Sequence, residues 1–222
     1  YHTFYPGQME LRAIQPELDE SIDTSFVFSD RLYSHDAYVY LEDDIKFNDR
    51  FKANIGLHAS LFSVGDKNYT SLQPRFSARY LIDENWSAKI SYAEMQQNIH
   101  LLTNSNAGLP TDIWVPSTIQ VKPQESSQIA AALTRTLDDG IYEISLEAYY
   151  KTMDNLITYK EGASFMSFND WQQTIETNGE GNSYGMELFL QKKKGKTSGW
   201  IGYTLSWTNS CLLYTSDAAD EE

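Results

Sequence analysis

Residues 75–92 read RFSARYLIDENWSAKISY, and this stretch decides the fold. Apolar and polar side chains alternate on both sides of a short polar turn, Asp83-Glu84-Asn85. One face of the stretch is therefore apolar, and it carries Phe76, Ala78, Tyr80, Ile82, Trp86, Ala88, Ile90 and Tyr92. A period of two is typical of β-strands with one apolar face. Two such runs joined by a short polar turn predict a β-hairpin.

The same unit recurs three more times along the chain. The predicted hairpins pair residues 37–47 with 51–61, residues 127–137 with 141–159, and residues 184–192 with 200–208. Together with the first hairpin they give eight strands, and a ninth is expected around residues 25–32. Several of these runs exceed ten residues, whereas strands of soluble proteins are usually about five or six residues long. Strands that cross a membrane at a tilt need ~9–11 residues.

The connections also alternate in length. Turns within the hairpins are short, and the links between hairpins, expected at residues 64–72, 103–122 and 161–181, are longer. This is the arrangement of outer-membrane barrels, which have short periplasmic turns and long extracellular loops. Aromatic residues gather near the strand ends, where a membrane interface favours them: Trp86, Tyr92, Tyr142, Tyr159, Tyr184, Trp200 and Trp207. The alternative is that they are ordinary core aromatics of a soluble β protein.

We therefore predict an all-β fold, a partial transmembrane antiparallel β-barrel with about eight or nine strands of a larger barrel. The second face of the strands carries Lys52, Arg75, Arg79, Lys89, Glu143, Glu147 and Glu187. In a barrel these residues would line a wet lumen or pack against a plug, and in a sandwich they would form the solvated outer faces. Alternation alone leaves both arrangements open, but strand length and loop asymmetry favour the barrel.

Composition excludes several classes of protein. The chain has 222 residues, of which 41% are hydrophobic and 14% aromatic, too many for a disordered chain. No run approaches ~18 consecutive apolar residues, so no transmembrane helix is expected. The formal net charge of −14 opposes nucleic-acid binding, which requires a basic face.

The last twelve residues stand apart from the pattern. Residues 211–220 read CLLYTSDAAD, which resembles a translated transposase sequencing adapter. We expect residues 211–222 to be a non-native tail and residues 1–210 to be an internal piece of the barrel. Excluding the tail removes four acidic residues, so the net charge changes from −14 to −10, and it removes the only cysteine. A cysteine-free native part rules out a disulfide scaffold and a Cys-based zinc site.

No constellation of residues predicts catalysis. The four histidines lack metal-ligand spacing, and neither a G-x-S-x-G elbow nor a P-loop is present. The acid pairs Asp43/Asp44 and Asp138/Asp139 resemble a glycosidase pair only superficially, since Asp138-Asp139-Gly140 is a turn signal. We expect no enzyme activity, no cofactor and no metal.

The two longest predicted loops offer candidates for ligand binding. Residues 103–122 include Asp112 and Trp114, and residues 161–181 include Phe168, Asp170 and Trp171. Exposed aromatic rings beside polar groups suit sugars or siderophores. The equal alternative is that Trp114 and Trp171 pack the loops onto the barrel rim or a plug.

Four motifs in order resemble the barrel of TonB-dependent outer-membrane receptors. Residues 40–57 (YLEDDIKFNDRFKANIGL) are similar to a family hairpin, with His58 where many members have Arg. Residues 72–80 (LQPRFSARY) resemble the following strand, and residues 183–188 (SYGMEL) resemble a later one. Residues 108–116 (GLPTDIWVP), followed by Lys122-Pro123-Gln124, look like a loop of Bacteroidetes-type receptors with an upstream carboxypeptidase-like regulatory domain.

The resemblance implies an uptake receptor in the outer membrane of a Gram-negative cell. Its partners would be membrane lipid, its own plug domain, TonB acting through the N-terminal plug region, and an extracellular bulky nutrient such as a siderophore or an oligosaccharide. A complete barrel would have about 22 strands, so this piece, excised, is not expected to fold stably alone. The alternatives are a passive porin and a soluble carbohydrate-binding β-sandwich module.

Overall fold

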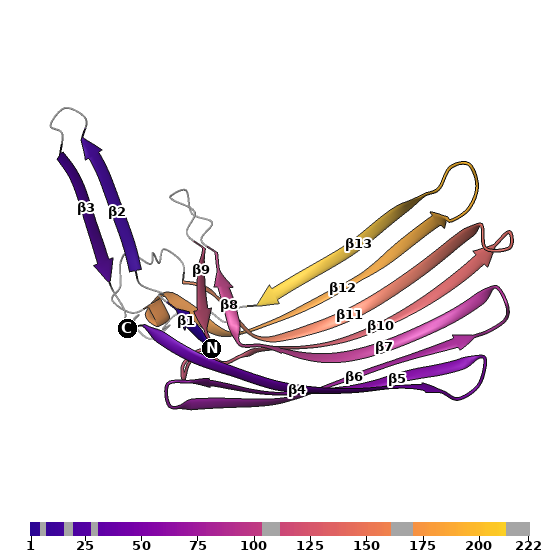
Figure 1. The fold of residues 1–222 in the computed structure, drawn as a ribbon, viewed down its shortest axis with the longest axis horizontal. Coiled ribbons are helices and arrows are strands. Elements are labelled where there is room, and N and C mark those ends of the chain that lie inside the picture. The colour runs from indigo at the N-terminus through magenta and orange to yellow at the C-terminus, as the bar shows by residue number, and fades with distance from the viewer. Residues whose placement is uncertain (5–7, 16–19, 28–30, 104–111, 161–170, 212–222) are drawn as a thin grey trace, which may run out of the picture.

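In a computed structural model of the chain, the described residues are 1–4, 8–15, 20–27, 31–103, 112–160 and 171–211. They form one long, curved sheet of nine strands in the order β1-β4-β5-β6-β7-β10-β11-β12-β13 (Figure 1). Every neighbouring pair is antiparallel. The strands are β1 (His2–Phe4), β4 (Leu32–Lys46), β5 (Phe51–Val64), β6 (Lys67–Leu81), β7 (Trp86–Gln97), β10 (Gln124–Leu137), β11 (Tyr142–Tyr159), β12 (Ile175–Lys192) and β13 (Gly199–Cys211).

Two small hairpins and one helical turn complete the described part. Strand β2 (Gln8–Gln15) pairs with β3 (Glu20–Val27), and β8 (Ile99–Leu102) pairs with β9 (Ile113–Pro116). A 3₁₀ turn, η1 (Trp171–Thr174), precedes β12. Among the described residues, no helix has the length and apolarity needed to cross a membrane. The prediction of an all-β partial barrel is confirmed.

All four predicted hairpins are present, and side chains at their turns explain why. The Asp83 carboxylate accepts hydrogen bonds from the backbone N–H groups of Asn85 (2.7 Å) and Trp86 (2.8 Å). Asn48 caps the β4–β5 turn in the same way. Such Asx turns reverse the chain locally and so fix the register of the strands that follow.

The predicted link at residues 64–72 is wrong, because β5 and β6 continue through it. Val64 pairs with Lys67, so only Gly65 and Asp66 form the turn. Gly65 has a φ of 54°, a left-handed conformation that glycine adopts at little cost. A Gly-Asp pair between strands is itself a hairpin signal.

The predicted link at residues 161–181 is too long, because β12 begins at Ile175. Its first residues pair with β11 across register shifts, and Asn155 and Asn178 have left-handed φ values of 58° and 60°. Bulges of this kind interrupt the alternation from which strands are predicted. The ninth strand expected at residues 25–32 is also misplaced. The ninth strand of the large sheet is β1, and β3 lies in a separate hairpin.

Pairing between β6 and β7 stops halfway along the two strands. It runs from Leu81–Ser87 to Arg75–Ala93, while β5–β6 continues to Val64–Lys67 and β7–β10 continues to Gln97–Gln124. Pro74 lies where the pairing ends, and proline has no N–H group to donate. The sheet therefore forks toward its long-loop end.

Candidate functional site

The two faces of the sheet differ sharply in polarity. Residues paired across the strands share a face, and one face is apolar from β5 to β13. A transverse row on this outer face runs through Ile55, Phe76, Tyr92, Ile129, Tyr150, Tyr184 and Trp207. Five of its seven members are aromatic, as an interfacial girdle requires.

Polar residues follow at once on the long-loop side of the aromatic row. The next row across β7, β10, β11, β12 and β13 holds Glu94, Ser127, Thr152, Asn182 and Asn209. The Tyr92 hydroxyl donates to the Glu94 carboxylate (2.6 Å). The ring therefore lies at the edge of the apolar band, and its hydroxyl group lies in the polar row.

The opposite edge of the apolar band carries two cation–aromatic pairs. The Arg135 guanidinium lies 5.0 Å from the Trp86 ring centroid, and the Lys192 ammonium lies 5.8 Å from that of Tyr142. Tyr92 and Trp86 are six residues apart on β7, about 20 Å along the strand. The band therefore approaches the ~25 Å height of the apolar belt of outer-membrane barrels, with polar rims on both sides.

The long-loop end holds a small hydrophobic core. It consists of Leu102, Val115, Val121, Trp171 and Ile175, all at most 5% exposed. Hydrogen bonds join the same segments, since Thr118 Oγ1 donates to Gln172 Oε1 (2.5 Å) and the Tyr69 hydroxyl donates to the Thr118 carbonyl (2.5 Å). Hairpin β8–β9, the η1 turn and the start of β12 thus form one packed unit against the polar face of β6.

A buried histidine lies within this loop core. His100 is 1% exposed, and its Nε2 lies 2.9 Å from Ser117 Oγ. Burial lowers the pKa of His100 from 6.5 to about 4, and an interaction with the Gln124 side chain opposes this shift only in part. The imidazole is therefore neutral at neutral pH, which suits a structural role in the loop core.

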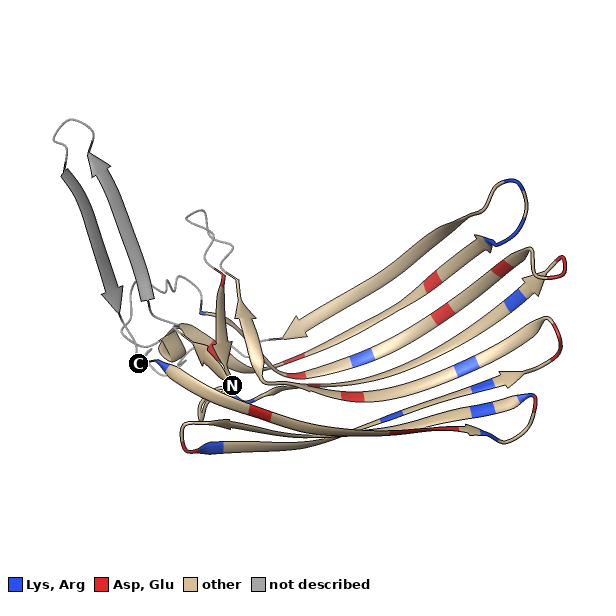
Figure 2. Cartoon of the chain, viewed as in Figure 1, with Lys and Arg blue, Asp and Glu red and all other residues tan. Residues whose placement is uncertain are grey.

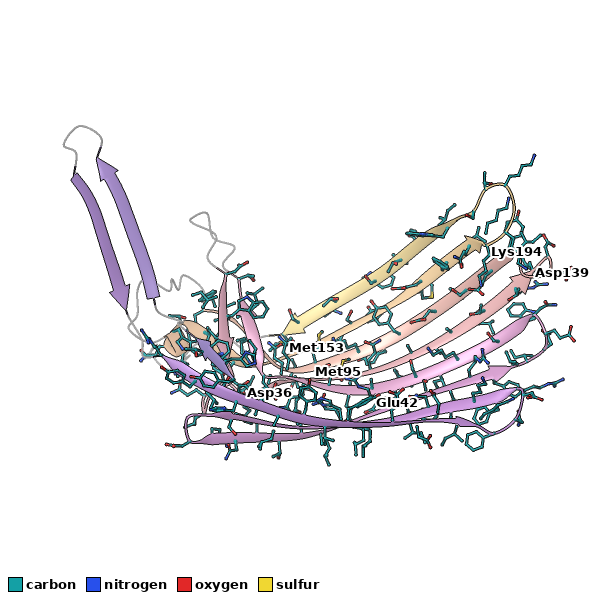
Figure 3. The ribbon with its side chains drawn as sticks, in the orientation of Figure 1. Asp36, Glu42, Met95, Asp139, Met153 and Lys194 are labelled. Carbon is teal, nitrogen blue, oxygen red and sulfur yellow. The ribbon has the colours of Figure 1, made fainter. Side chains whose placement is uncertain are left out.

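A pocket of about 470 Å³ opens where β6 parts from β7. Most of its lining comes from the polar face, and Figure 3 shows two of its residues, Met95 and Met153, near the base of the loops. Two cations, Arg75 and Lys151, and several amide side chains can donate hydrogen bonds into it. The remaining lining residues are His58, Gln73, Gln96, Gln97, Gln124, Glu125, Ser126 and Leu156.

Aromatic rings extend this pocket along β4. Tyr38 stacks on His58 with ring centroids 5.4 Å apart, and the Arg75 guanidinium lies 5.8 Å from the Tyr40 ring centroid. Gly56 makes room for this arrangement, because a Cβ there would lie 2.8 Å from the Tyr40 hydroxyl oxygen. His58 Nδ1 is buried without a hydrogen-bond partner among the described residues. The pocket therefore offers cations, amides and aromatic faces to a polar ligand.

A second hollow, of about 500 Å³, lies on the outer face. Short alanine side chains leave the space for it, among them Ala78, Ala88, Ala131 and Ala148. Because it lies within the apolar band, it would face membrane lipid, from which a hydrophilic nutrient is excluded. The pocket at the fork is the better candidate site.

The structure separates the candidate residues predicted from the loops. Trp171 is 5% exposed inside the loop core, which favours the packing alternative for this residue, whereas Trp114 on β9 is 57% exposed. Asp112 is exposed beside β9, near enough to Tyr159 for its charge to act on that phenol. Phe168 and Asp170 lie outside the described residues. A ligand contact remains a prediction for all five residues.

Sequence reasoning missed the pocket itself. Alternation placed Arg75 on the polar face, but it could not show that Lys151, three strands away in the sheet, lines the same pocket. That relation depends on the register Arg75–Ala93, Ala93–Gln128 and Gln128–Lys151. The useful signal was Pro74, which interrupts a long strand beside a charged residue.

The fold and its two unlike faces define the wall of a membrane β-barrel, and comparison with known proteins gives the family. A family model described as TonB dependent receptor-like, beta-barrel matches residues 5–221. The chain belongs to this family. No curated protein sequence matches it.

Solved structures agree on the fold. The FrpB iron transporter of Neisseria meningitidis superimposes with a TM-score of 0.58 at 16% identity, covering 82% of this chain and 27% of that one. The alcaligin outer-membrane receptor FauA of Bordetella pertussis gives 0.53 at 15% identity, covering 91% and 34%. The pyoverdine receptor FpvA of Pseudomonas aeruginosa gives 0.58 at 13% identity, covering 82% and 26%. The chain thus spans about a quarter to a third of these proteins.

Proposed function

We propose that the chain is part of the barrel wall of an outer-membrane receptor that takes up a bulky nutrient with energy supplied through TonB. The observation that carries the proposal is the pocket at the fork, which lies on the polar face next to the packed loops. A nutrient entering from the loop end would meet Arg75, Lys151 and the pocket amides first. Family membership supports TonB, a plug domain and membrane lipid as partners of the whole receptor.

The chemistry of the pocket supports a polar, anion-bearing ligand. Arg75 and Lys151 would pair with carboxylate, phosphate or metal-chelating oxygen groups, and the glutamine amides would bind hydroxyl or carbonyl groups. Relatives include receptors whose names specify alcaligin and pyoverdine. Trp114 and Asp112 would extend the contact at the rim, and Phe168, Asp170 and Trp171 remain proposed contributors.

The type of receptor and the bounds of its native segment are proposed from sequence resemblance. The loop at residues 108–116 supports a Bacteroidetes-type receptor with an upstream carboxypeptidase-like regulatory domain. The adapter-like residues 211–220 support a native barrel segment at 1–210 followed by a non-native tail. Recovering the reading frame of the locus tests both, because the native frame would encode plug and closing strands in place of the tail.

Uptake measured with and without TonB tests the proposal. The full-length protein would be expressed in the outer membrane of isogenic tonB-positive and tonB-negative cells, and binding and uptake of radiolabelled ferric siderophores and oligosaccharides would be compared. We expect uptake of one ligand class that requires TonB and falls about tenfold or more in Arg75→Gln/Lys151→Gln, since each lost charged hydrogen bond costs roughly 1.5–3 kcal/mol. The matched control is Lys194→Gln/Lys196→Gln, at the distant β12–β13 turn.

Two outcomes would contradict the proposal. Uptake that is independent of TonB would favour the passive porin. A protein that is monomeric and folded without detergent, and that binds sugars, would favour the soluble β-sandwich module.

A further inference from the structure

One transverse row on the polar face is sorted by charge. It crosses seven strands through Lys46, Lys52, Arg79, Lys89, Ala132, Glu147 and Glu187. Four adjacent strands thus contribute four cations, and the last two contribute two carboxylates. In Figure 2, blue bands lie side by side on β5, β6 and β7, and red bands lie on β11 and β12. The row therefore has a positive end and a negative end.

This order of charges does not stabilise the sheet by itself. Directly opposite residues have Cβ atoms ~4.5–5.5 Å apart, and like charges at that spacing repel each other. Lys52–Arg79 and Arg79–Lys89 are such pairs, and so is Glu147–Glu187. A sheet that needed only its own stability would alternate the signs, as cross-strand ion pairs do.

Partners within the chain neutralise only one end of the row. Lys46 Nζ lies 2.6 Å from Asp49 Oδ1 in the adjacent turn. The acid nearest in the next row, Asp44, accepts a hydrogen bond from Asn54 Nδ2 (2.9 Å). Among the described residues, no ion pair is found for Lys52, Arg79, Lys89, Glu147 or Glu187, and all five are exposed. These charges are available to a partner outside the chain.

The width of the row indicates the kind of partner. Neighbouring strands lie ~4.8 Å apart, so the six steps from Lys46 to Glu187 span about 29 Å along the wall. A drug-sized molecule cannot contact both ends at once, whereas a folded domain can. The neighbouring row has one large side chain, Tyr149, whose ring lies beside Gly185. Its other members are short, namely Asp44, Asn54, Ser77, Ser91, Ala130 and Gly185.

We propose that this row is an electrostatic seat that fixes the rotational orientation of the domain filling the barrel lumen. The domain would present carboxylates to β5–β7 and cationic side chains to β11–β12. Opposite polarity at the two ends makes one orientation attractive and the reversed orientation repulsive. This inference rests on the proposed function, in which the occupant of the lumen is the plug of a TonB-dependent receptor.

The test compares plug protection in three forms of the full-length receptor. Amide hydrogen exchange of the plug would be measured in detergent for the wild type, for Lys52→Gln/Arg79→Gln/Lys89→Gln, and for the control Lys67→Gln/Lys194→Gln/Lys196→Gln. The control removes the same charge from exposed positions away from the row, at the start of β6 and in the β12–β13 turn. We expect the row variant to exchange about tenfold faster in the plug, the order expected when three ion pairs are lost, and the control to match the wild type.

A salt series on the wild type supports the test without any substitution. Plug protection should fall as ionic strength rises from 0.01 M to 1 M, and the row variant should have lost most of this dependence. Protection of the barrel strands in the same spectra shows that each variant is folded.

Three outcomes would overturn the inference. The first is plug exchange that is insensitive to salt and to the row substitutions. The second is an equal effect of the control triple. The third is a row variant that loses only ligand affinity, which would assign the cations to a small anion. A receptor without a lumen domain and without TonB dependence would instead overturn the proposed function.

Discussion

The wall of the barrel and its loop core are stabilised in opposite ways. The wall exposes large apolar side chains on one face and charges on the other, and long ladders of backbone hydrogen bonds hold it together. The loop core buries its own side chains, among them Trp171, Val115 and Val121. The loop core therefore buries its apolar side chains against one another. The wall leaves its apolar face to be covered by lipid and its charged face to be covered by water or by the contents of the lumen.

The largest expected effect concerns the loop core. Trp171→Ala should destabilise the packed loops by about 3–5 kcal/mol, the usual cost of truncating a buried aromatic. Hydrogen exchange of hairpin β8–β9 would report the loss. Trp114→Ala is the matched control, since its ring is 57% exposed, and it should leave this protection unchanged. Equal effects of the two substitutions would contradict the distinction between core and rim.

The next prediction concerns the outer face of the wall. Leu146→Arg places a charge in the middle of the apolar band and should destabilise the folded barrel by about 2–4 kcal/mol in vesicles. Ser145→Arg, one residue away on the polar face, should cost much less. Denaturant-induced unfolding of the full-length protein would compare them. A larger cost for Ser145→Arg would reverse the assignment of the two faces.

Acid should weaken the loop core but not the wall. The pKa of His100 is lowered to about 4 in the folded state, so between pH 6.5 and 4 the unfolded loops bind a proton that the folded loops do not. The contribution of neutral His100 to the stability of the loop core is therefore fully present above pH 6.5. It is lost as the pH falls toward 4, which lowers the free energy of unfolding by up to about 3 kcal/mol. Exchange of β8–β9 measured from pH 7 to 4.5 would show this, after correction for intrinsic rates. In His100→Gln the dependence should disappear, and its persistence would point to another group.

The smallest expected effect tests close packing on the polar face. A Cβ on Gly185 would lie 2.6 Å from the Leu205 carbonyl oxygen and 3.0 Å from Tyr149 Cε1. Gly185→Ala should therefore cost about 1–3 kcal/mol, as overpacking does. Gly199→Ala meets nothing within 4 Å and should be nearly neutral. Thermal or denaturant midpoints of the two variants would test this, and equal midpoints would show that the sheet relaxes around residue 185.

The same division explains what the sequence could predict. In the wall, residues 75–82 and 86–92 each alternate without interruption and are joined by the Asx turn at Asp83, so strand type, pairing and the polarity of each face could be predicted directly. The bounds of strands were predicted wrongly where glycine or asparagine interrupts the alternation, at Gly65 and at Asn178. In the loop core the tryptophans look alike in sequence, and only tertiary packing separates buried Trp171 from exposed Trp114.

The candidate pocket and the charge row were beyond sequence reasoning for a different reason. Turn lengths set the register within a hairpin, but the register between hairpins, such as Lys89 opposite Ala132, depends on how separate units dock. Each charged residue could be placed on the polar face, yet its neighbours in the row could not be named.

The fork at Pro74 has a consequence for how the wall opens. In a closed barrel every strand is hydrogen-bonded to both neighbours along its full length, so strands can separate only from a rim inward. Here β6 and β7 are not paired from Arg75 to the loop end. Above this point the β5–β6 hairpin keeps ladder hydrogen bonds only with β4, and the hydrogen bond from the Tyr69 hydroxyl to the Thr118 carbonyl connects its other side to the loops. We therefore expect this hairpin to be the first part of the rim to move outward when the entrance widens.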